Sequence, residues 1–229
     1  MDEIKCILRN MQEEMRQQKA DMLDMKEDIK NTIVSNMSEK YNSLEEGEEL
    51  LPLDNEAKVI PSPVDYVDTW KAMEKLVDLG LTKSIGLSNF NKKQIDRVME
   101  VARIKPASLQ IEVHPYLNQV KLIDYARFLG ITVTAYAPLG SPDRPWAEPD
   151  EPRLLEDPLL KTIGKKHNKS PAQILIRYAI DRGLIVIPKS VTKSRIIQNF
   201  NVFDFQLTAE DMKTIGSLEC NRRLCTLGE

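Results

Sequence analysis

A regular stripe of apolar residues runs along the first 45 positions of the chain. Its members are mostly three, four or seven residues apart, which is the pattern of one apolar face on a long helix or of a coiled-coil seam. The stripe consists of Ile4, Leu8, Met11, Met15, Met22, Met25 and Ile29, and then continues in a shifted register. Two interpretations remain open: an amphipathic helix that lies on its own domain, and a coiled coil through which residues 4–44 self-associate.

An acidic stretch that contains prolines follows this stripe. Four glutamates between positions 45 and 49 repel one another, and three prolines between positions 52 and 63 disfavour helix. The sequence therefore predicts three regions: an amphipathic or coiled-coil helix over residues 1–45, an acidic, proline-containing linker over residues 46–65, and a folded domain over residues 66–229.

Beyond the linker, the hydrophobic pattern alternates between helical and strand-like segments. Two helix starts have strong local signals: Asn91 and Gln94 have the spacing of a capping box, and Ser170 precedes Pro171 with Gln173 at the third helical position. The pattern predicts helices at residues 66–78, 91–101, 120–128, 158–167, 171–183, 192–199 and 209–218, and strands at residues 84–88, 108–113, 131–136 and 184–188.

This alternation predicts an α/β domain in which helices cover a parallel sheet. The apolar strands at residues 131–133 and 184–187 suit burial on both faces. Four strand–helix units are visible, whereas a closed (β/α)8 barrel needs eight of them in ~250 residues. The 164 residues after position 65 suffice for half of such a barrel. The predicted fold class is therefore an incomplete (β/α)8 TIM barrel, preceded by a long amphipathic helix.

Composition and charge exclude several classes of protein. The chain is 41% hydrophobic and 29% charged with a net charge of −3, which excludes a chain-wide basic surface for nucleic acid. No apolar run approaches the ~18 residues that a membrane span needs, and the charged N-terminus lacks the apolar core of a signal peptide. Three scattered cysteines predict neither a disulfide scaffold nor a zinc site. We expect a cytoplasmic protein without nucleic-acid or membrane partners.

Polar residues gather where the predicted strands end. Ser88 and Asn89 close the first strand, Gln110 lies in the second, and Tyr136 ends the third. The carboxyl ends of parallel strands meet at one edge of a sheet, and in barrels this edge carries the site. We therefore predict a functional site along it.

The turn after the fourth strand is basic. Residues 189–195 (KSVTKSR) place hydroxyl groups and three cations around the start of a predicted helix. Unpaired N–H groups and the helix dipole favour a phosphate group at such a place. A solvated basic turn is the alternative interpretation. No GxGxxG or GxxxxGK[ST] motif supports a Rossmann domain or a P-loop.

Several motifs of the predicted domain resemble the aldo-keto reductases. They are GLSNFN at residues 86–91, QIEVHPYL at 110–117, TAYAPLGSPDRPW at 134–146, LLEDP at 154–158 and IPKSVT at 187–192. The resemblance is collinear, runs from about residue 51 to residue 225, and corresponds to the second half of that family's barrel. It implies an NADPH-dependent oxidoreductase that reduces aldehydes or ketones to alcohols, with a small carbonyl compound as its substrate.

The resemblance also implies which residues hold NADPH or NADP. Tyr136 would stack on the nicotinamide, and its carboxamide would be bound by Ser88, Asn89 and Gln110. The pyrophosphate would be lined by Leu139, Ser141 and Asp143. The adenosine 2′-phosphate would be held by Lys189, Ser190, Val191, Thr192 and Arg195, and the adenine would be reached by Gln198 and Asn199. The substrate pocket would be bordered by Trp146 and Cys225.

The resemblance does not supply the family's catalytic groups. Its Asp–Tyr–Lys–His set comes from the first half of the barrel, and no such set is identifiable here. We therefore predict no catalytic residue in this chain and leave its enzymatic activity open. His114 is expected to be structural and His167 to be exposed. Two alternatives to a reductase remain: a non-catalytic coiled-coil interaction protein that carries a degenerate half barrel, and a truncated chimeric product.

Overall fold

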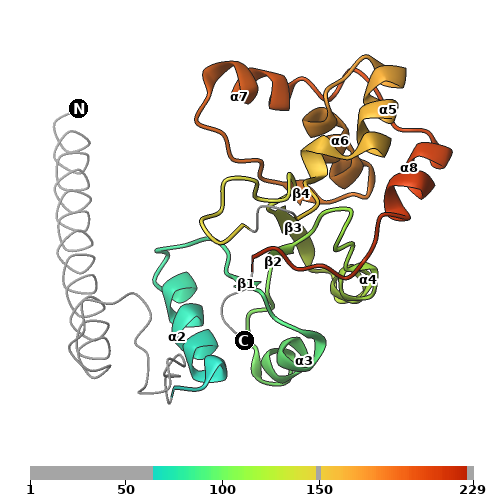
Figure 1. Ribbon diagram of the computed structural model, residues 1–229. Coiled ribbons are helices and arrows are strands. Elements are labelled where there is room, and N and C mark those ends of the chain that lie inside the picture. Colours follow the sequence, from blue (N-terminus) through green and yellow to red (C-terminus); the bar gives the residue numbers. More distant parts are fainter. Residues whose placement is uncertain (1–63, 148–150, 226–229) are drawn as a thin grey trace, which may run out of the picture. The chain divides into compact units, whose positions relative to one another are not determined.

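Four parallel strands form one sheet in the part of the chain that the structure describes. The computed structural model describes residues 64–147 and 151–225, and within them the strand order is β1-β2-β3-β4 (Figure 1). The strands are β1 (Gly86–Ser88), β2 (Ser108–Glu112), β3 (Thr132–Tyr136) and β4 (Ile185–Val186). Their register places Ser88 beside Gln110, and Glu112 beside Tyr136. The predicted α/β class with a parallel sheet is confirmed.

Helices connect these strands, as the alternating pattern predicts. They are α2 (Tyr66–Asp78), α3 (Lys92–Val101), α4 (Val120–Phe128), α5 (Pro158–His167), α6 (Pro171–Asp181), α7 (Lys193–Phe200) and α8 (Ala209–Gly216). Helices α2, α4 and α5 begin and end at the predicted residues. The last strand is shorter than predicted, and the short 3₁₀ helix η1 (Leu154–Glu156) was not anticipated.

Both predicted capping boxes are present. The Asn91 side chain accepts a hydrogen bond from the Gln94 N–H at 3.0 Å, and the Gln94 side chain accepts one from the Asn91 N–H at 2.9 Å. Ser170 and Gln173 make the same reciprocal pair at the start of α6. Each pair satisfies two N–H groups that the first helical turn leaves unbonded, which is why these helices begin where the sequence predicts.

The buried apolar side chains form two clusters. One packs α2, α3 and α4 against the sheet, and its fully buried members include Trp70, Ile95, Leu109, Ile111 and Ile123. The other joins α5, α6 and α8, which lie together in Figure 1, and it includes Leu160, Ile174, Leu175 and Ile215. Tyr116, in the loop after β2, and Leu154, in η1, also belong to the second cluster.

Close packing of β1 on β2 requires glycine at position 86. A Cβ atom there would lie 2.4 Å from the Ser108 hydroxyl oxygen and 2.8 Å from its carbonyl oxygen. This contact lies at the amino end of β1, where Gly86 pairs with Ser108.

Some predictions concern residues outside the described part of the chain. The amphipathic helix over residues 1–45, self-association through residues 4–44, and nearly all of the linker over residues 46–65 fall there. Among the described residues, no helix is both long enough and apolar enough to span a membrane.

Candidate functional site

The ends of the first three strands are joined by hydrogen bonds. Asn89, which follows β1, accepts a hydrogen bond on Oδ1 from the Tyr136 hydroxyl at 3.0 Å. The Asn89 N–H donates to the Gln110 carbonyl oxygen at 2.9 Å. Ser88 is exposed beside them, and Gln110 is half-buried. The structure therefore brings together the four residues predicted to hold a nicotinamide ring.

Tyr136 ends β3 with its ring half-buried. Burial raises the pKa of Tyr136 above its usual value, and the negative charge of Glu112 raises it further. The hydroxyl therefore keeps its proton at neutral pH. A neutral ring that is fixed by Asn89 is suited to stacking and unsuited to giving up a proton.

Three residues just beyond the strand ends have a left-handed backbone although none is glycine. Asn89 has φ of 59°, Ala137 has φ of 48° and Ser141 has φ of 44°. Asparagine tolerates such a backbone, whereas at Ala137 and Ser141 it is strained, and strained residues are common at binding and catalytic sites. Gln119, Asn168 and Asn221 have the same backbone elsewhere in the described residues. Asn89, Ala137 and Ser141 lie along the edge where the sequence predicts the site.

The loop after β3 contacts the C-terminal part of the chain. The Ser141 side chain hydrogen-bonds the Cys225 thiol, and the Trp146 indole N–H donates to the Leu224 carbonyl oxygen at 3.0 Å. Burial raises the pKa of the Cys225 thiol. Leu139 is half-buried and packs against the second apolar cluster. The two predicted pocket residues, Trp146 and Cys225, thus lie in two segments that contact one another.

The turn after β4 is exposed and makes few contacts of its own. Lys189 lies 3.7 Å from Asp143 in an exposed ion pair, and the Ser190 hydroxyl accepts a hydrogen bond from the Thr192 N–H at 3.2 Å. Val191 is 85% exposed. Thr192 precedes α7, but its side chain makes no capping hydrogen bond. The first turn of α7 therefore lacks the side-chain cap that α3, α6 and α8 have.

Three predicted contact residues on α7 are not joined to the rest of the site. Within the described residues, the Arg195 side chain makes no hydrogen bond or ion pair, and Arg195 and Gln198 are both exposed. Asn199 is half-buried. The guanidinium of Arg195 is thus a cation beside the uncapped start of a helix, where an anion is favoured by charge and by the helix dipole.

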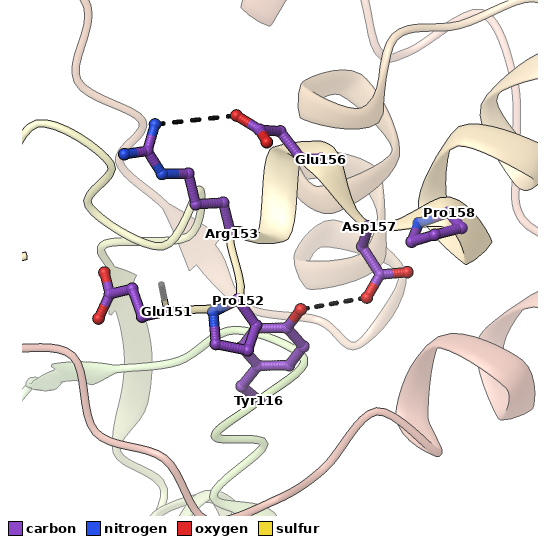
Figure 2. Close-up of a pocket in the computed structure, with 7 residues that line it drawn as sticks. All are labelled: Tyr116, Glu151, Pro152, Arg153, Glu156, Asp157 and Pro158. Carbon is purple, nitrogen blue, oxygen red and sulfur yellow. Dashed lines mark hydrogen bonds and ion pairs between the residues drawn. The ribbon is translucent and has the colours of Figure 1, made fainter. Parts of the chain in front are cut away.

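A pocket of about 400 Å³ lies elsewhere, between the loop after β2 and the segment around η1 (Figure 2). It is lined by Tyr116, Glu151, Pro152, Arg153, Glu156, Asp157 and Pro158, none of which is a predicted site residue. The Tyr116 hydroxyl donates to Asp157 at 3.1 Å, and burial with this bond raises the pKa of Tyr116 to about 12. Tyr116 is therefore a poor proton donor, and the strained, open edge remains the better site.

One Asp–Tyr–Lys group does come together, which the sequence did not predict. Tyr125 donates a hydrogen bond to Asp96, and Lys92 lies 2.7 Å from Asp96 and 4.4 Å from the centre of the Tyr125 ring. The bond to Asp96 raises the pKa of Tyr125. A tyrosine that donates a proton in catalysis needs a lowered pKa. This group, on the surface of α3 and α4, therefore has the wrong electrostatics for catalysis.

The two histidines have carboxylate partners. His114 is buried and lies 2.9 Å from Glu112, in agreement with a structural role. His167 was predicted to be exposed, and this is wrong: its side chain is 13% exposed and lies 2.8 Å from Asp211. Sequence position near a helix end suggested exposure, but α8 packs there and Asp211 faces the ring. Among the described residues, no group of three or more His, Cys, Asp or Glu side chains could hold a metal ion.

Two charged side chains near the edge are buried, which was not predicted: Glu112 was noted only as a polar residue near a strand end, and Arg144 was not noted. Glu112 is fully buried at the end of β2, and Arg144 is buried in the loop after β3, where it pairs with Glu151. A glutamate inside the otherwise apolar run IEV was the available signal, because a charge is buried only when it has partners.

Comparison with known proteins identifies the family. Residues 52–219 match the model of the Aldo/keto reductase family. The chain belongs to this family. It is 55% identical to Aldo-keto reductase family 1 member A1 of Gallus gallus and 54% identical to that of Xenopus tropicalis, over 80% and 77% of this chain. These matches cover 56% and 54% of the two relatives, so the chain spans about half the length of the curated relatives it matches.

A solved member of the aldo/keto reductase family has the same fold. The aldose reductase from Schistosoma japonicum is 50% identical, with a TM-score of 0.71 over 79% of this chain and 56% of that one. The α/β domain with its parallel sheet is therefore of the TIM-barrel kind found in aldose reductase.

Proposed function

We propose that this chain binds NADP(H) along the carboxyl edge of its sheet. Tyr136 would stack on the nicotinamide, with Ser88, Asn89 and Gln110 around the carboxamide, and Leu139, Ser141 and Asp143 along the pyrophosphate. The adenosine 2′-phosphate would be held by Lys189, Ser190, Val191, Thr192 and Arg195, with Gln198 and Asn199 at the adenine. When bound, NADPH supplies a hydride for the reduction of an aldehyde or ketone.

The observation that carries this proposal is the contrast between the two ends of the edge. Asn89 and Tyr136 are hydrogen-bonded and fixed, as a flat ring and its amide require. Arg195 makes no hydrogen bond or ion pair within the described residues and lies at the uncapped start of α7, as a phosphate group requires. The residues present therefore fit a dinucleotide that carries an extra phosphate, which is the difference between NADP and NAD.

We further propose that the described residues are the second half of a (β/α)8 barrel. Four parallel strands lie within them, and a closed barrel of this kind has eight. Within the same residues, the one Asp–Tyr–Lys group has the wrong electrostatics, so a positioned proton donor is missing. Loss of general acid catalysis costs a factor on the order of 10²–10⁴ in rate. We expect this chain alone to bind the coenzyme and to reduce carbonyl compounds weakly or not at all.

The experiment that tests this proposal is a fluorescence titration of NADPH with the full chain, followed by a carbonyl reduction assay on the same preparation. Binding should appear as a saturable change of NADPH emission. Absence of any change at high micromolar protein would defeat the binding proposal. Aldehyde reduction at ordinary enzymatic speed without a second chain would defeat the proposal that the proton donor is missing.

A non-catalytic interaction protein is the second candidate, because the described surface carries large exposed apolar side chains near β4 and α7. Phe200 and Phe203 are 75% and 65% exposed and contact one another edge to face, and Ile185 on β4 is also exposed. Apolar surface of this kind is typical of contacts with another protein. If residues 4–44 drive self-association, deleting residues 1–45 should abolish it. An unchanged oligomeric size by light scattering would exclude that mode.

A further inference from the structure

The Glu112 carboxylate is the most enclosed charge near the proposed site. Glu112 ends β2, its side chain is 0% exposed, and His114 Nε2 lies 2.9 Å from its Oε1 atom. Because a carboxylate can only accept, this histidine nitrogen carries the proton. Burial opposes the charge of Glu112, but the bonds from His114 and from two backbone N–H groups outweigh it and lower the pKa. Glu112 is therefore a buried anion at neutral pH.

Those two N–H groups belong to the C-terminal segment, which we define as residues 220–225. The Leu224 N–H donates to Glu112 Oε1 at 2.7 Å, and the Cys225 N–H lies 3.3 Å from both carboxylate oxygens. Arg223 Nη1 lies 3.6 Å from Oε2. The partners are more than 110 positions apart in the chain, so the carboxylate joins the end of β2 to residues that follow the last helix.

The same segment is joined to the loop after β3. The Leu224 carbonyl oxygen accepts from the Trp146 indole, Cys225 hydrogen-bonds Ser141, and Arg222 lies 3.4 Å from Glu151. Glu112 thus accepts hydrogen bonds from N–H groups of the segment, and the Trp146 indole donates one to a carbonyl oxygen of the same segment. A segment with no regular secondary structure is held in this way by groups from two strand ends.

We propose that Glu112 is a positioning residue that holds the C-terminal segment against the loop after β3, and so keeps Cys225 and Trp146 at the border of the substrate pocket. The position of the pocket rests on the proposed function. The contacts that hold the segment do not. Without the carboxylate, as in Glu112→Gln, His114 and the two N–H groups share one neutral amide oxygen in place of two charged ones, and the segment then detaches more often.

Cys225 reports detachment because its thiol is partly buried by the contact. In a full-length Cys6→Ser, Cys220→Ser background it is the one remaining thiol of the three in the sequence. Its rate of reaction with 5,5′-dithiobis(2-nitrobenzoate) is measured without coenzyme. Because the charge of Glu112 also raises the pKa of the Cys225 thiol, the rate is measured over a range of pH and the rate constant of the thiolate is compared. Glu112→Gln should raise this rate constant by roughly tenfold, because charged hydrogen bonds contribute about that factor to an opening equilibrium.

The matched control is Asp211→Asn. Asp211 is also a buried carboxylate that accepts from a histidine and from a backbone N–H group, but its partners are His167, Lys166 and Thr208. This variant should lower the melting temperature and leave Cys225 reactivity unchanged. Equal rates for Glu112→Gln and the background protein, or an equal increase in Asp211→Asn, would overturn the proposal.

A second pair of variants tests the segment itself, in case Glu112→Gln does not fold. Leu224→Pro removes the N–H that donates to Glu112, and Leu224→Ala removes the same apolar side chain while keeping that N–H. Leu224→Pro should increase Cys225 reactivity several-fold more than Leu224→Ala. Equal rates would contradict the proposal. NADPH titration of each variant is recorded separately, so that failure of the positioning role and failure of coenzyme binding are distinguished.

Discussion

The two ends of the proposed coenzyme edge are built in opposite ways. At the ends of β1–β3, side chains bond one another: Asn89 receives the Tyr136 hydroxyl, and its N–H reaches β2. At the turn after β4, the side chains face solvent, and the cation of Lys189 has a 3.7 Å exposed ion pair with Asp143. The side chains at the first end are held in place by hydrogen bonds without a ligand. The second end provides exposed charged side chains.

This difference follows from what each end would bind. A flat ring must be oriented, and orientation requires side chains that other contacts already hold in place. A phosphate group is recognised by charge and by N–H donors, and flexible cations at a helix start provide both. If rigidity and charge are separated in this manner, substitutions at the two ends should have different effects on folding and on binding.

Removing the charge should weaken binding without affecting folding. The Lys189→Ala, Arg195→Ala double variant should lower NADPH affinity by about 100-fold, because two charge-assisted hydrogen bonds contribute about 1.5 kcal/mol each. Both side chains are exposed, so the free energy of unfolding should change by no more than about 0.5 kcal/mol. Fluorescence titration and urea unfolding measure the two quantities. A Lys121→Ala, Lys161→Ala variant, with two exposed cations elsewhere, is the control and should bind as the unmodified chain does.

Removing the hydrogen bond between Asn89 and Tyr136 should lower the stability of the fold. Asn89→Ala should lower the free energy of unfolding by about 2 kcal/mol, because it loses the bond from Tyr136 and places alanine at a φ of 59°. Asn89→Gly loses the same bond but tolerates that backbone, so it should cost about 1 kcal/mol. Urea unfolding of the two variants separates the contributions. Equal losses would mean that the left-handed backbone at position 89 does not penalise alanine.

Salt should act on one end of the edge alone. Raising the salt concentration from about 0.05 to 0.5 M should weaken NADPH binding by roughly tenfold, because exposed charges are screened. Binding of reduced nicotinamide mononucleotide, which lacks the 2′-phosphate, should change by less than about twofold. A calorimetric titration of both ligands measures this. An equal salt dependence would place the charged contacts at the nicotinamide end.

The smallest effect concerns acid. The folded pKa of Glu112 lies below its usual 4.5, so its contribution to stability is fully present above pH 4.5 and is lost as the pH falls through the folded value. In Glu112→Gln, the free energy of unfolding should therefore fall less steeply with decreasing pH below pH 4.5. The difference in slope should be up to about 1 kcal/mol per pH unit. Thermal melts between pH 3 and 6 test this. A variant whose melts decline in parallel with the unmodified chain would argue against it.

Local signals made much of this fold predictable. The caps at Asn91 and Ser170 depend on residues three positions apart, so the sequence contains the whole interaction. Strand β4 was predicted to span residues 184–188 and has two residues, because strand length depends on backbone partners. Within the described residues, β4 pairs with β3 alone. The apolar character of residues 184–188 does not show how many strands will pair with them.

The contacts that shape the candidate site were predicted less well. Ser88, Asn89, Gln110 and Tyr136 were predicted from their place at the strand ends, and their role at the nicotinamide came from the resemblance. The register of the strands then explains why they meet. The hydrogen bond from the Leu224 N–H to Glu112 could not be predicted in this way, because the two residues are distant in sequence and the donor is a backbone group. The environment of His167 was misjudged for the same reason, since Asp211 is 44 positions away.

The central claim is that the carboxyl edge holds a coenzyme with a 2′-phosphate. The most direct test is a parallel titration of the full chain with NADPH and with NADH under the same low-salt conditions. We expect saturable binding of both, with NADPH at least about tenfold tighter, since the phosphate adds charged hydrogen bonds. Equal affinities, or no binding of either at high micromolar protein, would contradict it.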